Sequence, residues 1–168
     1  MARANRLARL LTVLGVIVIT IGCDRITKQA AERHLAGHPR LSLADDVIRL
    51  EYAENRGGFL SVGADLPAPV RTVVFGFGAA VALAWVGVWA ARRVVGGGSA
   101  IGPALLWAGG IANLADRIAR ESVVDFLNLG LGSLRTGIFN VADVAITVGI
   151  ALVAIEIARA RVARRVQE

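Results

Sequence analysis

The sequence AIGPALLWAGGIANLADR, residues 100–117, decides the fold of this chain. It is apolar up to Ala112 and ends in a polar group formed by Asn113, Asp116 and Arg117. A helix needs about 20 residues to cross a bilayer, so this stretch almost spans one. A carboxylate at membrane depth costs several kcal/mol and is a functional candidate by default. We therefore expect a membrane helix whose polar end contributes to a functional site.

The composition of the whole chain indicates an integral membrane protein. The 168 residues are 55% hydrophobic and only 5% aromatic, and the mean hydropathy is +0.61. Arginines cluster at both ends, which favours contacts with anionic membrane lipids over binding to nucleic acid. The chain has a single cysteine, which excludes an intrachain disulfide. It has no HExxH motif, so a zinc site is not expected. We expect residues 1–168 to form a single membrane domain without a metal or cofactor.

Four apolar stretches predict an α-helical membrane protein with four transmembrane helices. They cover approximately residues 7–24, 70–91, 100–117 and 137–158. A fourth helix that begins near Gly137 would place Asp143 about 9 Å inside it. Arginine density is highest in the N-terminus, at 92–93 and in the C-terminus. The positive-inside tendency therefore predicts that both termini and the 92–99 turn are cytoplasmic.

The segment 25–69 is expected to form a small extracytoplasmic β/α element between the first and second spans. Residues 28–36 continue as a helix that Gly37 ends, and the alternation in 47–52 is typical of a half-exposed strand. The sequence Asn-Arg-Gly-Gly at 55–58 is typical of a turn. This element would cover a site at the outer ends of the spans.

The predicted topology brings five polar fragments to the outer side of the membrane. These are residues 23–28, 54–58, 113–117, 123–126 and 139–143. Asp24 and Lys28 have the i, i+4 spacing of an ion pair, and Asp116 is expected to form a structural salt bridge with Arg117. Asp125, in a loop between spans, and Asp143, within a span, have no lysine on the same turn. They are the strongest candidates for chemistry.

Other functions place polar residues in membrane helices as well. A transporter or proton relay would need polar groups along the whole crossing, but the inner halves are apolar apart from Glu156, which we expect to pair locally with Arg159. A lipoprotein leader ending at Cys23 would not be followed by three more spans. A presenilin-type protease would need a Gly-x-Gly-Asp motif, which is missing. A purely structural bundle leaves the polar fragments unexplained.

Taken in order, these fragments resemble the motifs of the lipoprotein signal peptidase family, also called signal peptidase II. The matching residues are Asp24-x-x-Thr27-Lys28, Asn55-x-Gly57, Asn113-Leu114-x-Asp116-Arg117, Val124-Asp125-Phe126 and Phe139-Asn140-x-Ala142-Asp143. The chain departs from the family pattern at Ala112, before Asn113, and at Gly58-Phe59-Leu60, where the family usually has Ala-Ala-Phe. Neither departure removes an ionisable residue.

The resemblance implies an aspartic endopeptidase of the bacterial inner membrane, with its active site near the extracytoplasmic face. It would cleave diacylglyceryl-modified prolipoproteins before the lipidated cysteine, and inhibitors such as globomycin would bind it. Carried over, the catalytic dyad is Asp125 and Asp143. The residues suited to substrate binding are Asn55, Gly57, Asn113, Arg117 and Asn140, while Asp24, Lys28 and Asp116 would support the frame. Membrane lipids are the other expected partners. We expect the enzyme to be a monomer.

Overall fold

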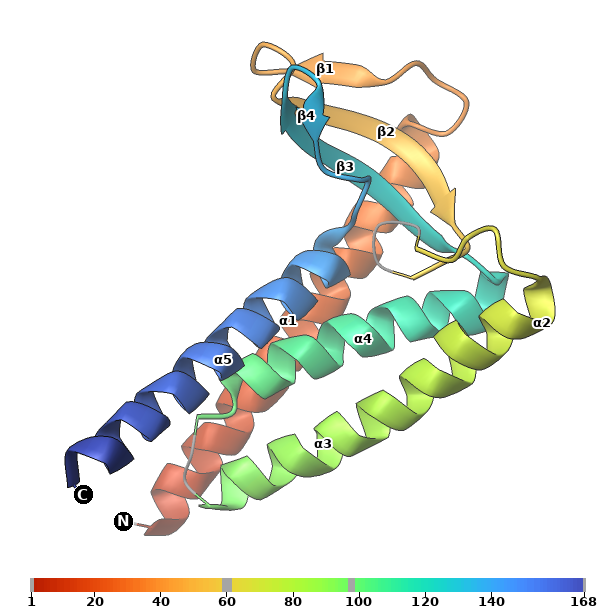
Figure 1. Ribbon diagram of the computed structural model, residues 1–168. Coiled ribbons are helices and arrows are strands. Elements are labelled where there is room, and N and C mark those ends of the chain that lie inside the picture. Colours follow the sequence, from red (N-terminus) through yellow and green to blue (C-terminus); the bar gives the residue numbers. More distant parts are fainter. Residues whose placement is uncertain (1, 59–61, 97–98, 168) are drawn as a thin grey trace.

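The computed structural model describes residues 2–58, 62–96 and 99–167, which form a helical bundle with a small sheet at one end (Figure 1). The long helices are α1 (Ala2–His34), α3 (Ala79–Gly96), α4 (Ile101–Arg120) and α5 (Val141–Gln167). A short helix α2 (Ala68–Arg71) and the π-helix η2 (Thr72–Gly78) lead directly into α3. Both termini lie at the end of the bundle opposite the sheet (Figure 1).

Three stretches of helix are long and apolar enough to cross a membrane. They are Arg6–His34, Ala68–Arg93 and Val141–Ala163, with mean hydropathies of 2.0 to 2.2. Helix α4 has a different environment, because it packs against α1, α3 and α5. The residues it buries are mostly small ones, such as Gly102, Ala104 and Ala108. The expectation of a mostly helical, membrane-type protein is confirmed.

Glycines set the close approach between α4 and α5. A Cβ atom on Gly109 would lie 2.4 Å from the backbone oxygen of Ala142. A Cβ atom on Gly149 would lie 2.7 Å from the backbone oxygen of Gly102. Small residues allow helix backbones in membranes to approach this closely, where packing replaces the hydrophobic effect as the main attraction. The position of α5 relative to α4 therefore depends on residues without side chains.

The sheet is antiparallel and its four strands follow the order of the chain. They are β1 (Leu41–Leu43), β2 (Ile48–Asn55), β3 (Val123–Leu131) and β4 (Leu134–Arg135). The strand expected at 47–52 is confirmed and continues to Asn55. The sheet is not confined to the segment between the first two long helices, because β3 and β4 lie between α4 and α5. The strands at 123–135 were missed, although Leu127, Leu129 and Leu131 alternate with other residues.

Two expectations about the aspartates are wrong in their local structure. Asp125 lies within β3 and not in a loop. The last helix begins at Val141 and not near Gly137. The cause is that Phe139 pairs with Leu127 of β3, each backbone N–H donating to the other's oxygen at 2.9 Å. Asp143 therefore lies in the first turn of α5, not about 9 Å inside a helix.

Helix α1 continues past the apolar stretch up to the sheet. The helical segment expected at 28–36 is the last part of α1, and the chain turns at Gly37, whose φ is +74°. Ala31 and Leu35 are buried with Val124 of β3, and the partly buried Leu50 of β2 packs against them. This apolar contact fixes the sheet on the end of α1.

At the opposite end of the bundle, α3 and α5 are joined by an ion pair. Arg93 Nη1 lies 2.5 Å from Glu156 Oε1. The expected local pair between Glu156 and Arg159 is therefore wrong, because a residue of another helix comes closer. Helix α3 extends to Gly96, into the expected 92–99 turn, and residues 97–98 of that turn lie outside the described residues, as do Phe59 and Leu60.

Candidate active site

Asp125 and Asp143 are joined through the side chain of Asn140. Asn140 Nδ2 donates to Asp125 Oδ1 at 2.6 Å, and the backbone N–H of Asp143 donates to Asn140 Oδ1 at 2.9 Å. All three residues are buried, with exposed fractions of 1% for Asp125, 6% for Asp143 and 1% for Asn140. One amide side chain therefore fixes two buried carboxyl groups, one on the sheet and one on a helix.

This geometry follows from the way α5 begins. Asn140 immediately precedes the helix, and its backbone N–H donates to Asp143 Oδ2 at 3.2 Å. The Asn140 side chain accepts from Asp143 N in return, so the two residues form a reciprocal capping box. The side chain of Asp143, at the third position of α5, is thus held close to Asn140, which caps the helix. The cap also fixes the carboxylate of Asp143.

Two further asparagines hold the outer oxygens of the carboxyl groups. Asn55 Nδ2, at the end of β2, donates to Asp125 Oδ2 at 2.9 Å. Asn113 Nδ2, on α4, donates to Asp143 Oδ1 at 2.9 Å. All four carboxyl oxygens of the pair therefore accept a hydrogen bond from this chain. The structure brings together the residues that the sequence separated by up to 88 positions, from Asn55 to Asp143.

Lys28 sets the orientation of Asn113. Its ammonium group donates to Asn113 Oδ1 at 2.9 Å, and it lies 2.7 Å from Asp24 Oδ2 and 2.7 Å from Asp116 Oδ2. An ammonium group donates only, so the Asn113 oxygen must face Lys28. The Asn113 amino group must then face Asp143. Lys28 acts on the carboxyl pair through this one amide.

The acidic partners of Lys28 also tie the helices together. Asp24 Oδ1 accepts from the backbone N–H of Ala142 at 2.9 Å, which satisfies one of the free donors in the first turn of α5. Arg25 Nη1 lies 3.3 Å from Asp116 Oδ1. The expected ion pair of Asp24 with Lys28 is confirmed. Asp116 pairs with cations of α1, and the expected salt bridge with Arg117 is wrong.

Arg117 holds the segment that follows β2. Its Nη2 donates to the backbone oxygen of Gly57 at 2.7 Å, and the backbone N–H of Gly57 donates to Asn55 Oδ1 at 2.9 Å. Arg117 Nη1 also donates to the backbone oxygen of Asn113 at 3.4 Å. Its Nε is buried and has no hydrogen-bond partner among the described residues. Gly57 is thus fixed beside the carboxyl pair, and three of the five guanidinium N–H groups of Arg117 make no hydrogen bond to the described residues.

Burial changes the acidity of Asp125. It raises the pKa of this carboxyl group from 3.8 to about 6, and the nearby charge of Asp143 acts in the same direction. The hydrogen bonds from Asn55 and Asn140 oppose the change because they stabilise the ionised form. A carboxyl group with a pKa near 6 exchanges a proton readily at neutral pH. Among the described residues, no group of three or more His, Cys, Asp and Glu side chains is placed to hold a metal ion.

An apolar cavity of about 570 Å³ opens beside Asp143. Its polar lining comes from Asn113, Arg117, Asp143 and Thr147. Its apolar lining comes from Val74, Phe75, Ala79, Ala82, Leu83, Leu106, Ile146 and Ile150, together with Gly58, Gly78 and Gly110. These apolar residues could not be identified from the sequence, since similar ones occur on every face of the long helices. The cavity can receive an extended or helical apolar segment with its polar backbone at Asp143.

Two buried carboxyl groups share one asparagine at the polar end of an apolar cavity between membrane-type helices, an arrangement suited to an aspartic hydrolase that works at a membrane. In this class one carboxylate activates water and the other, protonated, polarises the substrate carbonyl.

Comparisons with known proteins agree with this class. The family model described as signal peptidase (SPase) II matches residues 16–159. A lipoprotein signal peptidase of Geobacter sulfurreducens is 32% identical over 148 residues, which cover 88% of this chain and 89% of that protein. One of Sulfurihydrogenibium is 30% identical over 146 residues, covering 86% and 89%. The chain belongs to the signal peptidase II family, which consists of aspartic peptidases.

The fold also resembles that of two solved structures, each described as a bacterial membrane enzyme. One has a TM-score of 0.71 with 19% sequence identity, and the match covers 88% of both chains. The other has a TM-score of 0.70 with 20% identity, covering 87% of this chain and 92% of that one. At these identities the likeness concerns the fold.

Proposed function

We propose that Asp125 and Asp143 are the catalytic pair with which this chain removes signal peptides from lipidated prolipoproteins. The observation that carries the proposal is their connection through Asn140 at the polar end of the cavity. Two carboxyl groups this close to one amide cannot both ionise cheaply, so they share a proton at neutral pH. Burial and, to a smaller extent, the charge of Asp143 raise the pKa of Asp125, which favours a protonated member of the pair.

The reaction is a hydrolysis in two stages of bond making and breaking. The ionised carboxylate takes a proton from a water molecule as its oxygen attacks the carbonyl carbon of the scissile peptide bond. The protonated carboxyl group donates a hydrogen bond to the carbonyl oxygen and then supplies the proton to it. Collapse of the tetrahedral intermediate breaks the C–N bond, and the amine leaves with the proton that the pair took from water. A hydroxyl group of the intermediate returns a proton to the other carboxylate as the carboxylic acid product forms, so the pair again holds one proton.

The hydrogen bonds divide the predicted substrate-binding residues into two groups. The side chains of Asn55, Asn113 and Asn140 are engaged with the carboxyl pair, which supports a positioning role for them. Gly57 and Arg117 border the pair without bonding to it. They are the better candidates to hold the substrate backbone, Gly57 through its lack of a side chain and Arg117 through its free Nε. Asp24, Lys28 and Asp116 support this frame.

The same proposal includes four spans, with both termini in the cytoplasm and the sheet outside. Helix α4 has 20 residues, enough for about 30 Å at 1.5 Å per residue. It is enclosed by the other helices, so it needs fewer apolar side chains than a helix that faces lipid. The termini lie opposite the sheet (Figure 1), as an even number of crossings requires. A reporter fused after Val95 should therefore give a cytoplasmic signal in the bacterial inner membrane, and an extracytoplasmic signal would contradict the orientation.

The substrate specificity follows from the cavity. Its apolar part faces η2, α3 and α5, so the signal peptide helix would lie there and the diacylglyceryl chains would stay in lipid between the helices. Each buried methylene of an acyl chain contributes about 0.8 kcal/mol. An inhibitor such as globomycin would compete for the same cavity. One chain supplies every residue of the proposed site, so the enzyme would act as a monomer.

The test is cleavage of one prolipoprotein with and without its diacylglyceryl group by the purified enzyme. We expect the lipidated form to be cleaved before the modified cysteine and the unlipidated form to be cleaved at least about a hundredfold more slowly, since two acyl chains supply more binding energy than such a factor requires. Mass spectrometry of the products identifies the cleaved bond. Equal rates on both forms, or cleavage elsewhere, would contradict the proposal.

A further inference from the structure

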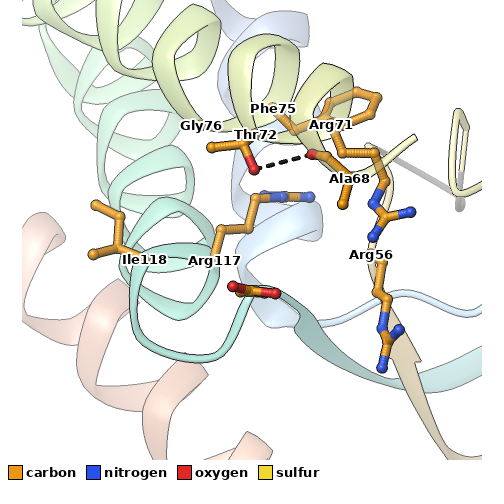
Figure 2. A pocket seen from close by; sticks show the side chains of 9 residues that line it. Arg56, Ala68, Arg71, Thr72, Phe75, Gly76, Arg117 and Ile118 are labelled. Carbon is orange, nitrogen blue, oxygen red and sulfur yellow. Dashed lines mark hydrogen bonds between the residues drawn. The ribbon is translucent and has the colours of Figure 1, made fainter. Parts of the chain in front are cut away.

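A second, smaller cavity gathers three arginines outside the carboxyl pair. It has a volume of about 220 Å³ and is lined by Arg56, Arg71 and Arg117 together with Thr72, Phe75, Ile118, Glu121, Ala68 and Gly76. Figure 2 shows the side chains of Arg56, Arg71 and Arg117, which come from three different segments of the chain and line this cavity. Among the described residues of the lining, Glu121 is the one acidic side chain, so three arginines and one glutamate give these residues a net charge of +2.

None of the three arginines forms an ion pair with the residues that the structure describes. Arg71 Nη1 donates to the backbone oxygens of Leu66 at 2.8 Å and Ala64 at 3.2 Å. Arg117 also donates only to backbone oxygens. Within the described ranges, the Arg56 side chain has no hydrogen-bond partner. Several other arginines do pair with carboxylates, as at Arg93 with Glu156 and Arg120 with Glu32.

Backbone oxygens orient a guanidinium group without neutralising it. Arg71 and Arg117 are therefore held in place with their full charge, and their remaining N–H groups are left for a ligand. Planar guanidinium groups bind the oxygens of phosphate through pairs of parallel hydrogen bonds. Three arginines against one glutamate, with Arg71 and Arg117 oriented by backbone oxygens, are thus suited to a phosphate group, and the cavity volume accommodates one.

The surroundings of the cavity indicate where that phosphate comes from. Ile118, in its lining, is 77% exposed, and Val73 and Phe77 on the adjoining η2 are 61% and 71% exposed. These apolar side chains are suited to acyl chains. The cavity also lies where α4 ends and α2 begins, at the end of the bundle that carries the sheet (Figure 1). A basic cavity bordered by apolar side chains at the end of a membrane bundle is suited to a phospholipid head group.

We propose that Arg56, Arg71 and Arg117 bind the phosphate group of a membrane phospholipid beside the substrate cavity. The two cavities share Phe75 and Arg117 in their linings. A bound phospholipid would therefore close the substrate cavity on the outer side of Arg117. This inference concerns lipid binding and does not depend on the proposed peptidase chemistry.

The experiment is isothermal titration of the full chain in neutral detergent with dihexanoyl-phosphatidylglycerol, and separately with inorganic phosphate. We expect saturable binding of the phospholipid that weakens at least about tenfold in Arg56→Gln and in Arg71→Gln, because each loses one charge-assisted contact. Glu121→Gln should strengthen binding, since it removes the only negative charge of the lining. The double variant Arg33→Gln/Arg40→Gln is the matched control, because both residues are exposed and lie outside the cavity.

The arms distinguish the sources of the phosphate. Binding of both ligands, lost together in Arg56→Gln, supports recognition of phosphate alone, and binding of the lipid only supports recognition of the head group with its chains. The Arg56 side chain makes no hydrogen bond within the described ranges, so Arg56→Gln should fold normally. It therefore tests the proposal even if Arg71→Gln fails to fold. Unchanged affinity in Arg56→Gln would overturn the proposal. The proposal would also be overturned if neither phosphate ligand binds but an acidic hexapeptide does, and if that peptide binding is lost in Arg56→Gln.

Discussion

Replacement of Lys28 by methionine should destabilise the protein strongly. Lys28 is 3% exposed, and its ammonium group donates to Asn113 Oδ1 and lies 2.7 Å from carboxylate oxygens of both Asp24 and Asp116. Methionine has a similar length and helix propensity but leaves two buried carboxylates without their shared cation. Breaking a buried ion pair on one side costs about 3–5 kcal/mol. For a chain of this size the loss corresponds to a decrease in Tm of about 6–20 °C.

The assay is thermal unfolding of the purified protein in detergent, followed by circular dichroism. Arg33→Met, on the exposed side of the same helix, is the control and should change Tm little. The double variant Lys28→Met/Asp24→Asn should recover part of the loss, because it removes one uncompensated charge and keeps an oxygen for Ala142 N–H. A free energy of unfolding of Lys28→Met within about 1 kcal/mol of the unmodified protein would refute this account of the cluster.

Two further predictions concern the helix contact and the acidity of the carboxyl pair. Gly109→Ala should destabilise the fold by about 2 kcal/mol or more and lower peptidase activity, whereas Gly110→Ala should have a smaller effect on both, as measured by unfolding and cleavage assays. The reason is that a Cβ on Gly109 meets backbone at 2.4 Å, while one on Gly110 meets the movable end of Leu83 at 2.3 Å, and equal effects would contradict it. Asn55→Ala should shift the alkaline limb of the kcat/KM pH profile upward, because its hydrogen bond holds down the pKa of Asp125, which is raised to about 6. A shift of the alkaline limb to lower pH would contradict the assigned role of this hydrogen bond. The pKa that the limb reports belongs to the coupled pair of carboxyl groups.

The stability of the fold should respond to the same group. The pKa of Asp125 is about 6 in the folded state and 3.8 as the ordinary value, so the folded state holds more protons between these pH values. The contribution of Asp125 to stability is therefore fully present below about pH 4 and is lost as pH rises through about 6. Ionisation of Asp125, which the proposed chemistry uses near neutral pH, therefore lowers the stability of the fold.

The apolar stretches predicted the helices because hydropathy over about 20 residues is a strong, local signal. The polar fragments identified Asp125, Asp143 and their asparagines as one group because topology required them to meet. The start of α5 could not be predicted in the same way. Gly137 looks compatible with the following apolar helix, but a long-range pairing of Phe139 with Leu127 holds the segment in an extended form.

The strand that carries Asp125 was missed for a similar reason. Residues 123–131 alternate only weakly, and β3 is stabilised by pairing with β2, in which Asn55, the partner of Val123, lies 68 positions earlier in the chain. A partner this distant leaves no trace in local sequence patterns. The roles of Lys28 and Asn113 also depend on such contacts. Lys28 is the single lysine among the 19 lysine and arginine residues of the chain. A tetrahedral donor suits three acceptors around one point, which a planar guanidinium does not.

If Asp125 and Asp143 perform the hydrolysis together, the cleavage rate of a lipidated prolipoprotein by Asp125→Asn and Asp143→Asn should show it directly. We expect each variant to lose activity by a factor of about 10² to 10⁴ or more, while circular dichroism shows that the helices remain. Asp65→Asn, at an exposed aspartate outside the site, should keep full activity. Turnover near that of the unmodified enzyme in either Asp125→Asn or Asp143→Asn would contradict the claim.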